Sequence, residues 1–173
     1  MSKVVLGFSG GVDSAVSAVL LQKAGHEVHG VYLDNAEESA RLDAVSAAER
    51  MGIALTVIDV KRELEENVCR PFTEAYLRGE TPNPCIICNP SVKFRTLIAV
   101  ADRIDAELVA TGHYARIEVD GEGLSHLLPA ADAEADQSAA LAGLPQEVLA
   151  KLVLPLGEFT KAEVAEMLAD TAE

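Results

Sequence analysis

A short segment rich in glycine and serine near the N-terminus constrains this chain more than any other feature. Residues Ser9 to Ser14 read Ser-Gly-Gly-Val-Asp-Ser, and they lie between an apolar run of β type, residues 4–8, and a helical stretch, residues 15–23. Two glycines let a backbone approach an anion without a Cβ in the way. The N–H groups of the loop and of the first helical turn then point at one spot. The segment therefore predicts a phosphate-binding loop after a first strand.

The side chains of this loop suit a nucleotide phosphate. Ser9 and Ser14 can donate hydroxyl hydrogen bonds, and Asp13 can hold a magnesium ion. The loop lacks the Gly-Lys-Ser/Thr ending of a Walker A motif, and it resembles instead the loop of the ATP pyrophosphatases, which cleave ATP between the α and β phosphates. The alternative is a glycine-rich turn that only opens a helix, with Asp13 or Ser14 as its cap.

Strand and helix patterns alternate along the first two thirds of the chain. Further strands are expected at residues 27–33, 53–60 and 107–111. Helices are expected at residues 36–51, 63–69, 72–77 and 93–104, with Pro71 separating two of them and a proline-rich loop at residues 81–90. Repeated strand–helix units predict an α/β fold with a doubly wound parallel sheet covered on both faces. The Ser9–Ser14 loop, residues 33–35 and residues 111–113 all follow strands, so they should converge on one crevice.

The last third is less regular. Residues 116–119 and 124–128 flank Asp-Gly-Glu-Gly and predict a hairpin, whereas residues 130–142 show no clear pattern. Pro145 suits the first turn of a short helix, and a capping box at residues 160–163 starts a final helix that reaches about Ala169. We expect one domain over residues 1–173, with a nucleotide-binding core at 1–115 and the hairpin and C-terminal helices at 116–173.

Charge and hydropathy limit the classes of partner. The 173 residues include 14 basic and 28 acidic ones, a formal net charge of −14, which is unfavourable for a protein that binds nucleic acid. Six basic residues between 62 and 103 form either a local basic patch or a solvated mixed-charge face. No apolar run reaches the length of a membrane span and the N-terminus lacks a signal-peptide pattern, so a cytoplasmic protein without membrane contact is expected.

A cysteine pair in the proline-rich loop is the second strong signal. Cys85 and Cys88 lie in the run Thr-Pro-Asn-Pro-Cys-Ile-Ile-Cys-Asn, residues 81–89. Two thiols at this spacing can form a redox pair, share a metal or present one activated thiolate, and an inert surface pair is the alternative. A closed zinc site needs four ligands. Besides Cys85 and Cys88, the candidates for the remaining ligands are Cys69 and four histidines. Cys69 lies on a helical pattern and is expected to be a core thiol.

With these motifs together, the chain resembles the tRNA-specific 2-thiouridylases, a family of PP-loop ATP pyrophosphatases with an adenine nucleotide alpha hydrolase-like fold. The resemblance covers nearly the whole chain in family order. It rests most strongly on residues 7–16 and 78–89, and further on residues 92–94, 110–116, 136–138, 154–157 and 160–161.

The resemblance implies a chemistry and a set of site residues. In that family the uracil carbonyl oxygen takes the AMP group of ATP, pyrophosphate leaves, and a cysteine persulfide then delivers sulfur as AMP departs. The catalytic residues carried over by motif are Cys88 as nucleophile, Cys85 and Asp13, the last also holding magnesium through ATP. Residues for ATP would be Gly7, Phe8, Ser9, Gly10, Gly11, Val12, Asp13, Ser14, Leu33 and Gly112, with His113 either near the nucleotide or merely packed at the strand end. Residues for the tRNA base and backbone would be Asn83, Pro84, Cys85, Asp136 and Gln137.

Departures from the family pattern leave alternatives open. Cys85 stands where many members have an aspartate, which favours an iron–sulfur cluster on Cys85 and Cys88 or a disulfide relay. Ala135 stands where the family has a lysine that contacts tRNA. The family's second catalytic cysteine and its tRNA-binding domain would lie beyond Glu173. Expected partners are tRNA, a sulfur-carrier protein or cysteine desulfurase, and a further subunit in a homodimer or hetero-oligomer. The alternatives to tRNA thiolation are sulfuration of a small molecule or carrier protein, and a non-catalytic nucleotide-binding subunit.

Overall fold

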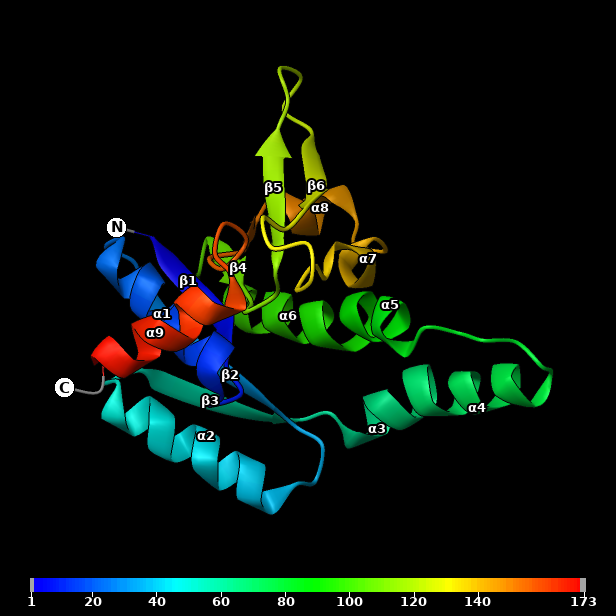
Figure 1. The fold of residues 1–173 in the computed structure, drawn as a ribbon. Helices are drawn as coiled ribbons and strands as arrows, with labels where there is room; N and C mark the ends of the chain where they lie inside the picture. The colour runs from blue at the N-terminus through cyan, green and yellow to red at the C-terminus, as the bar shows by residue number, and fades with distance from the viewer. Residues whose placement is uncertain (1, 172–173) are drawn as a thin grey trace.

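The computed structural model describes residues 2–171, and its centre is a five-stranded parallel sheet (Figure 1). The sheet runs in the order β3 (Ala54–Asp59), β2 (Glu27–Asp34), β1 (Lys3–Gly7), β4 (Leu108–Ala110) and β7 (Leu152–Val153). A separate antiparallel hairpin, β5 (Ala115–Val119) and β6 (Ser125–Pro129), projects from the body. The predicted α/β class with a parallel sheet is confirmed.

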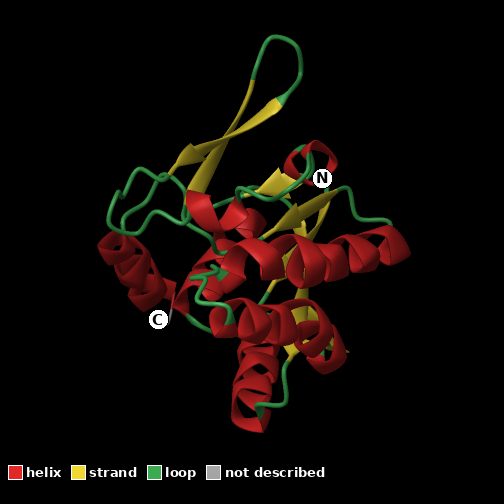
Figure 2. Ribbon diagram, turned by 90° about the vertical axis from the view of Figure 1, so that its right-hand side faces the viewer, coloured by secondary structure: helices red, strands yellow, loops and turns green. Residues whose placement is uncertain are grey.

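Helices cover both faces of the sheet (Figure 2). The α-helices are α1 Val12–Lys23, α2 Glu38–Arg50, α3 Lys61–Leu64, α4 Arg70–Leu77, α5 Pro84–Cys88, α6 Phe94–Ile104, α7 Ser138–Leu141, α8 Gln146–Leu149 and α9 Lys161–Thr171. Two single π-helical turns, η1 Glu65–Cys69 and η2 Asn89–Lys93, join some of them. Within residues 2–171 no helix has the length and apolarity that crossing a bilayer requires.

The central strand shows why the sheet has two covered faces. Val4 and Leu6 of β1 pack in one cluster with Ala18 of α1, whereas Val5 packs in another cluster with Leu97 of α6. Successive side chains of a strand point to opposite faces, so an uninterrupted apolar run is buried on both. The layers place the N-terminus of α1 at the carboxyl end of β1, where the predicted loop lies.

Gly10 shapes the turn between β1 and α1. Its φ of +79° is in the left-handed region, and a Cβ built on it would lie 2.7 Å from the Cα of Ala44 in α2. A side chain there would be strained and would also push α2 away. The loop can therefore close tightly over α2 only with glycine at this position.

The proline-rich segment is partly helical, which corrects the prediction of a loop over residues 81–90. Helix α5 begins at Pro84, and Asn83 caps it, because its side-chain oxygen accepts the backbone N–H of Cys85 at 3.0 Å. Proline suits a first helical position, where no N–H donor is needed. The prolines therefore start a helix here, and the cysteine pair lies on it.

The predicted separation of two helices at Pro71 is also wrong, and Pro90 likewise lies within a continuous helical path. These paths run without interruption from Lys61 to Leu77 and from Pro84 to Ile104, with η1 just before Pro71 and η2 containing Pro90. A proline lacks an N–H and its ring crowds the carbonyl four residues earlier. One wider turn, closed by an i→i+5 hydrogen bond, accommodates it: Phe94 N–H donates to the Asn89 carbonyl, and Arg70 N–H donates to the Glu65 carbonyl.

Candidate functional site

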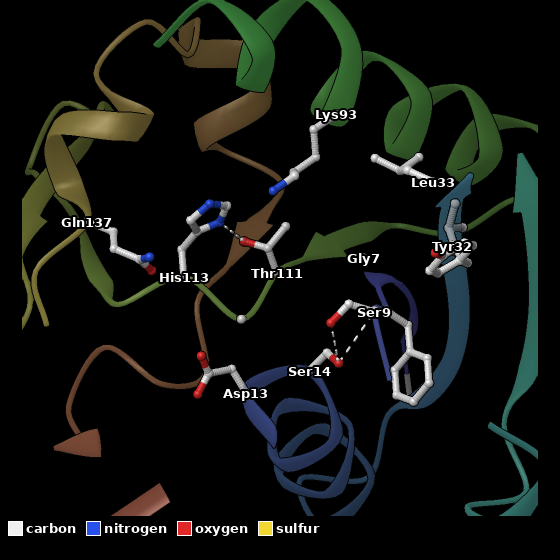
Figure 3. Close-up of a pocket in the computed structure, with 13 residues that line it drawn as sticks. Gly7, Ser9, Asp13, Ser14, Tyr32, Leu33, Lys93, Thr111, His113 and Gln137 are labelled. Atoms are coloured by element: carbon white, nitrogen blue, oxygen red, sulfur yellow. Dashed lines mark hydrogen bonds between the residues drawn. The ribbon is translucent and has the colours of Figure 1, made fainter. Parts of the chain in front are cut away.

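A cavity of about 290 Å³ opens at the carboxyl edge of the sheet (Figure 3). Three segments that are distant in sequence line it: the loop after β1, the end of β2, and the residues after β4. This is the convergence that the strand order predicts. The residues that line the cavity include Ser9, Asp13, Ser14, Tyr32, Leu33, Lys93, Thr111, Gly112, His113 and Gln137.

Hydroxyl groups hold the loop after β1 in shape. The Ser9 and Ser14 hydroxyl oxygens lie 3.2 Å apart, and the Ser14 hydroxyl donates to the Gly11 carbonyl at 3.0 Å. Gly11 is the N-cap of α1, and no side chain caps this helix. The reading of Asp13 or Ser14 as a mere helix cap is therefore wrong. The first-turn N–H groups of α1 remain available for an anion.

Asp13 presents a carboxylate to the cavity. The Tyr114 hydroxyl donates to one of its oxygens at 2.8 Å, and the other oxygen makes no hydrogen bond to residues 2–171. Burial, followed by this hydrogen bond, raises the pKa of Tyr114, which therefore stays a neutral donor. Magnesium is commonly held by one carboxylate together with substrate phosphates. Asp13 fits that role, with Tyr114 fixing its orientation.

Two basic side chains lie on the opposite wall of the cavity. His113 Nδ1 lies 2.8 Å from the Thr111 hydroxyl oxygen, and burial, assisted by the charge of Lys93, lowers the pKa of His113 to about 3. His113 is therefore neutral at physiological pH. Burial also lowers the pKa of Lys93. Lys93 was not among the residues expected to bind ATP, although it belongs to a matched motif, whereas His113 was expected either near the nucleotide or packed at the strand end.

We predict that His113 makes the protein less stable in acid. Its native pKa is about 3, whereas an unfolded chain restores the ordinary value of 6.5. Between those values the unfolded chain binds a proton that the native state does not, so the free energy of unfolding falls as the pH drops through this window. The free energy of unfolding, measured by denaturant titration at several pH values, should fall more steeply with decreasing pH for the wild type than for His113→Gln. Equal slopes would contradict the prediction.

The cysteines lie beside the cavity rather than in its wall. Cys85 is exposed, whereas Cys88 is half-buried and packs against Val60, Val68 and Val92. Burial raises the pKa of Cys88 although the charge of Lys93 opposes it, so this conformation favours the neutral thiol over the activated thiolate that was one of the predicted alternatives. Cys69 is exposed, so the expectation of a core thiol is wrong.

The cysteines do not form a metal site in this arrangement. Among residues 2–171, no three His, Cys, Asp or Glu side chains are grouped so that they could hold a metal ion. A zinc ion or an iron–sulfur cluster would need more ligands than Cys85 and Cys88. Cys85 and Cys88 by themselves therefore do not fit a zinc ion or an iron–sulfur cluster.

The remaining predicted site residues divide into two groups. Gly7, Phe8 and Gly112 line the cavity, whereas Gly10, Gly11 and Val12 shape the loop without lining it. A Cβ on Gly112 would lie 3.2 Å from Asp13, so this glycine lets the two segments approach closely.

The residues expected to meet tRNA are largely engaged in local structure. Asn83 and Pro84 form the start of α5. The Asp136 carboxylate accepts the Ala130 N–H and the Ser138 hydroxyl, both at 2.8 Å. Gln137 lines the cavity, and its side-chain oxygen accepts the Tyr114 N–H at 3.0 Å.

Comparison with known proteins identifies close relatives by sequence. The chain is 42% identical over 182 residues to the tRNA-specific 2-thiouridylase MnmA of Geobacter metallireducens, covering 95% of this chain and 50% of that protein. It is 43% identical over 182 residues to the same enzyme of Chloroflexus aggregans, covering 98% of this chain and 51% of that protein. The chain thus spans about half the length of the curated relatives it matches.

Solved structures share the fold at low sequence identity. A 4-thiouridine synthetase in complex with RNA and ATP matches with a TM-score of 0.63 and 18% identity, over 98% of this chain and 40% of that one. A predicted subunit of a tRNA methyltransferase from Methanocaldococcus jannaschii matches with a TM-score of 0.59 and 18% identity, over 98% of this chain and 75% of that one.

A family model, described as the tRNA methyl transferase HUP domain, matches residues 2–172, and the chain therefore belongs to that family.

Proposed function

We propose that this chain is the ATP-using part of a sulfurtransferase that places sulfur on a uridine of tRNA. One observation carries the proposal. The uncapped N-terminus of α1, the Asp13 carboxylate and the Lys93 ammonium group all border one cavity, and a cysteine pair lies beside it. The similarity to tRNA-specific 2-thiouridylases supports the choice of tRNA.

In this proposal ATP fills the cavity. The phosphates lie against the loop of residues 9–14, where backbone N–H groups and the hydroxyls of Ser9 and Ser14 can bind them. Leu33, at the end of β2, offers an apolar contact to the adenine. Asp13 would hold magnesium, which supplies positive charge to the departing pyrophosphate. Residues 1–115 would thus bind the nucleotide, and Gln137 from the C-terminal part would complete the wall.

The reaction then has two steps. The uracil carbonyl oxygen attacks the α-phosphorus of ATP, and the bond from that phosphorus to the bridging oxygen of the β-phosphate breaks to release pyrophosphate. In the second step the terminal sulfur of a Cys88 persulfide attacks the activated carbon, and AMP leaves with the former carbonyl oxygen. A thiol, either that of Cys85 or an external one, then attacks the Cys88 sulfur, so that the S–S bond breaks, the thiolated base is released and a disulfide remains. A cysteine desulfurase or a sulfur-carrier protein would supply the persulfide sulfur. Asn83, Pro84, Cys85, Asp136 and Gln137 are proposed to meet the tRNA.

A pyrophosphate-release assay tests the proposal. We expect release from MgATP with tRNA that lacks the thiol modification, and little release without tRNA or with fully thiolated tRNA. Release driven by a small metabolite or by a carrier protein would replace tRNA as the substrate. ATP binding without release under all of these conditions would instead indicate a nucleotide-binding subunit.

A further inference from the structure

Lys93 lies half-buried between the nucleotide cavity and the cysteine pair. It is the last residue of η2, five residues after Cys88, and its side chain lines the cavity. Figure 3 shows its amino group reaching toward Thr111 and His113. Lys93 therefore lies close to both halves of the proposed reaction.

The π turn explains how one lysine reaches both places. In a regular α-helix, a residue five positions after Cys88 points well away from it, since neighbours on one face are three or four residues apart. A π turn is wider, and its i→i+5 hydrogen bond stacks residues that are five apart. Pro90 is the physical cause of the turn, because it cannot continue the ordinary hydrogen-bond pattern. Single π turns are frequent at functional sites.

The surroundings of Lys93 leave its charge uncompensated. No carboxylate within the described part of the chain forms an ion pair with it, and its ammonium group makes no hydrogen bond there. The groups that interact with it electrostatically are the thiols of Cys88 and Cys85 and the neutral imidazole of His113. A half-buried cation without a partner is partly desolvated, and an anion brought into the site would offset that loss of hydration.

We propose that Lys93 is a shared cation that binds a phosphate of the nucleotide on one side and stabilises the anionic sulfur of Cys88 on the other. The role in sulfur transfer rests on the proposed function, whereas binding and thiol reactivity can be measured without turnover. Lys93 opposes the effect of burial on the Cys88 thiol, since its positive charge lowers the pKa that burial raises. Lys93 thereby limits the rise in the Cys88 pKa, and its loss is expected to raise that pKa further.

Alkylation of Cys88 tests one side of the proposal. Replacing Cys69 and Cys85 by serine leaves Cys88 as the single thiol of this chain, which has three cysteines. In that background we expect Lys93→Met to slow iodoacetamide alkylation at neutral pH about tenfold, because the thiolate is the reactive form. Lys93→Arg keeps the charge and should stay within about threefold of the parent protein.

Calorimetric titration with MgATP tests the other side. Lys93→Met should weaken binding about tenfold or more, since a cation near the phosphates is lost. Lys151→Met is the matched control, because Lys151 is exposed and pairs with Asp102 away from the cavity. Thermal unfolding of each variant shows that the fold is retained.

The two measurements together decide the proposal. Slower alkylation and weaker MgATP binding in Lys93→Met, with both preserved in Lys93→Arg and Lys151→Met, support the shared role. A change in only one measurement, or in neither, overturns it. Absence of tRNA-dependent pyrophosphate release would refute the proposed function and leave these two results unaffected.

Discussion

Asp13→Asn is expected to slow pyrophosphate release about 100-fold or more, a loss typical of removing one group that stabilises developing charge. The substitution keeps the shape of the side chain and removes its negative charge, so magnesium would lose the protein ligand that we propose for it. The Tyr114 hydroxyl can still donate to the remaining side-chain oxygen, and the 2.8 Å contact can persist. The effect should therefore appear in metal-dependent steps rather than in folding.

Binding measurements separate the metal from the nucleotide. Calorimetric titration with ATP, with and without magnesium, should show that the ion strengthens binding to the wild type but not to Asp13→Asn. Asp102→Asn is the control, because it removes an exposed carboxylate at the end of α6 without touching the cavity. A magnesium-dependent gain in affinity that survives in Asp13→Asn would show that Asp13 is not the ligand.

The sequence was most informative where local pattern and chemistry coincide. The apolar run of β1, the glycines that follow it and the helical pattern of α1 together indicated both the parallel sheet and the loop at its edge. Such signals depend on residues that are adjacent in the chain. The convergence of the loop with Leu33 and Gly112 followed from their positions at the ends of predicted strands, because parallel strands end at one edge.

The features that could not be predicted arise from contacts distant in sequence or from strain. A proline is ambiguous in a sequence: Pro84 starts α5, whereas Pro90 is tolerated by widening one turn. That wider turn directs Lys93 into the cavity, a placement that α-helical spacing does not give. Strand β7 has two residues, Leu152 and Val153, too few to show a periodic pattern, and it forms only by pairing with β4. The hydrogen bond between Tyr114 and Asp13 joins residues 101 positions apart.

Replacing Cys88 by alanine is expected to remove sulfur transfer and to preserve adenylation, because the two steps use different groups. Cys88 is absent from the cavity wall and packs against Val60, Val68 and Val92, so its removal should leave the ATP site intact. Pyrophosphate release should then stay within about threefold of the wild type, the range expected when no contact to the transition state is lost. Thiolated uridine in nuclease-digested tRNA, measured by mass spectrometry, should fall to background.

Variants of the other two cysteines make the assignment of Cys88 specific. Cys69→Ser changes an exposed thiol that the mechanism does not use, and it should thiolate tRNA at the wild-type rate. Cys85→Ser tests the neighbouring thiol on α5, which is more exposed than Cys88. Thiolation that persists in Cys88→Ala and disappears in Cys85→Ser would transfer the nucleophilic role to Cys85. The half-buried thiol would then serve only to pack α5 against η1 and η2.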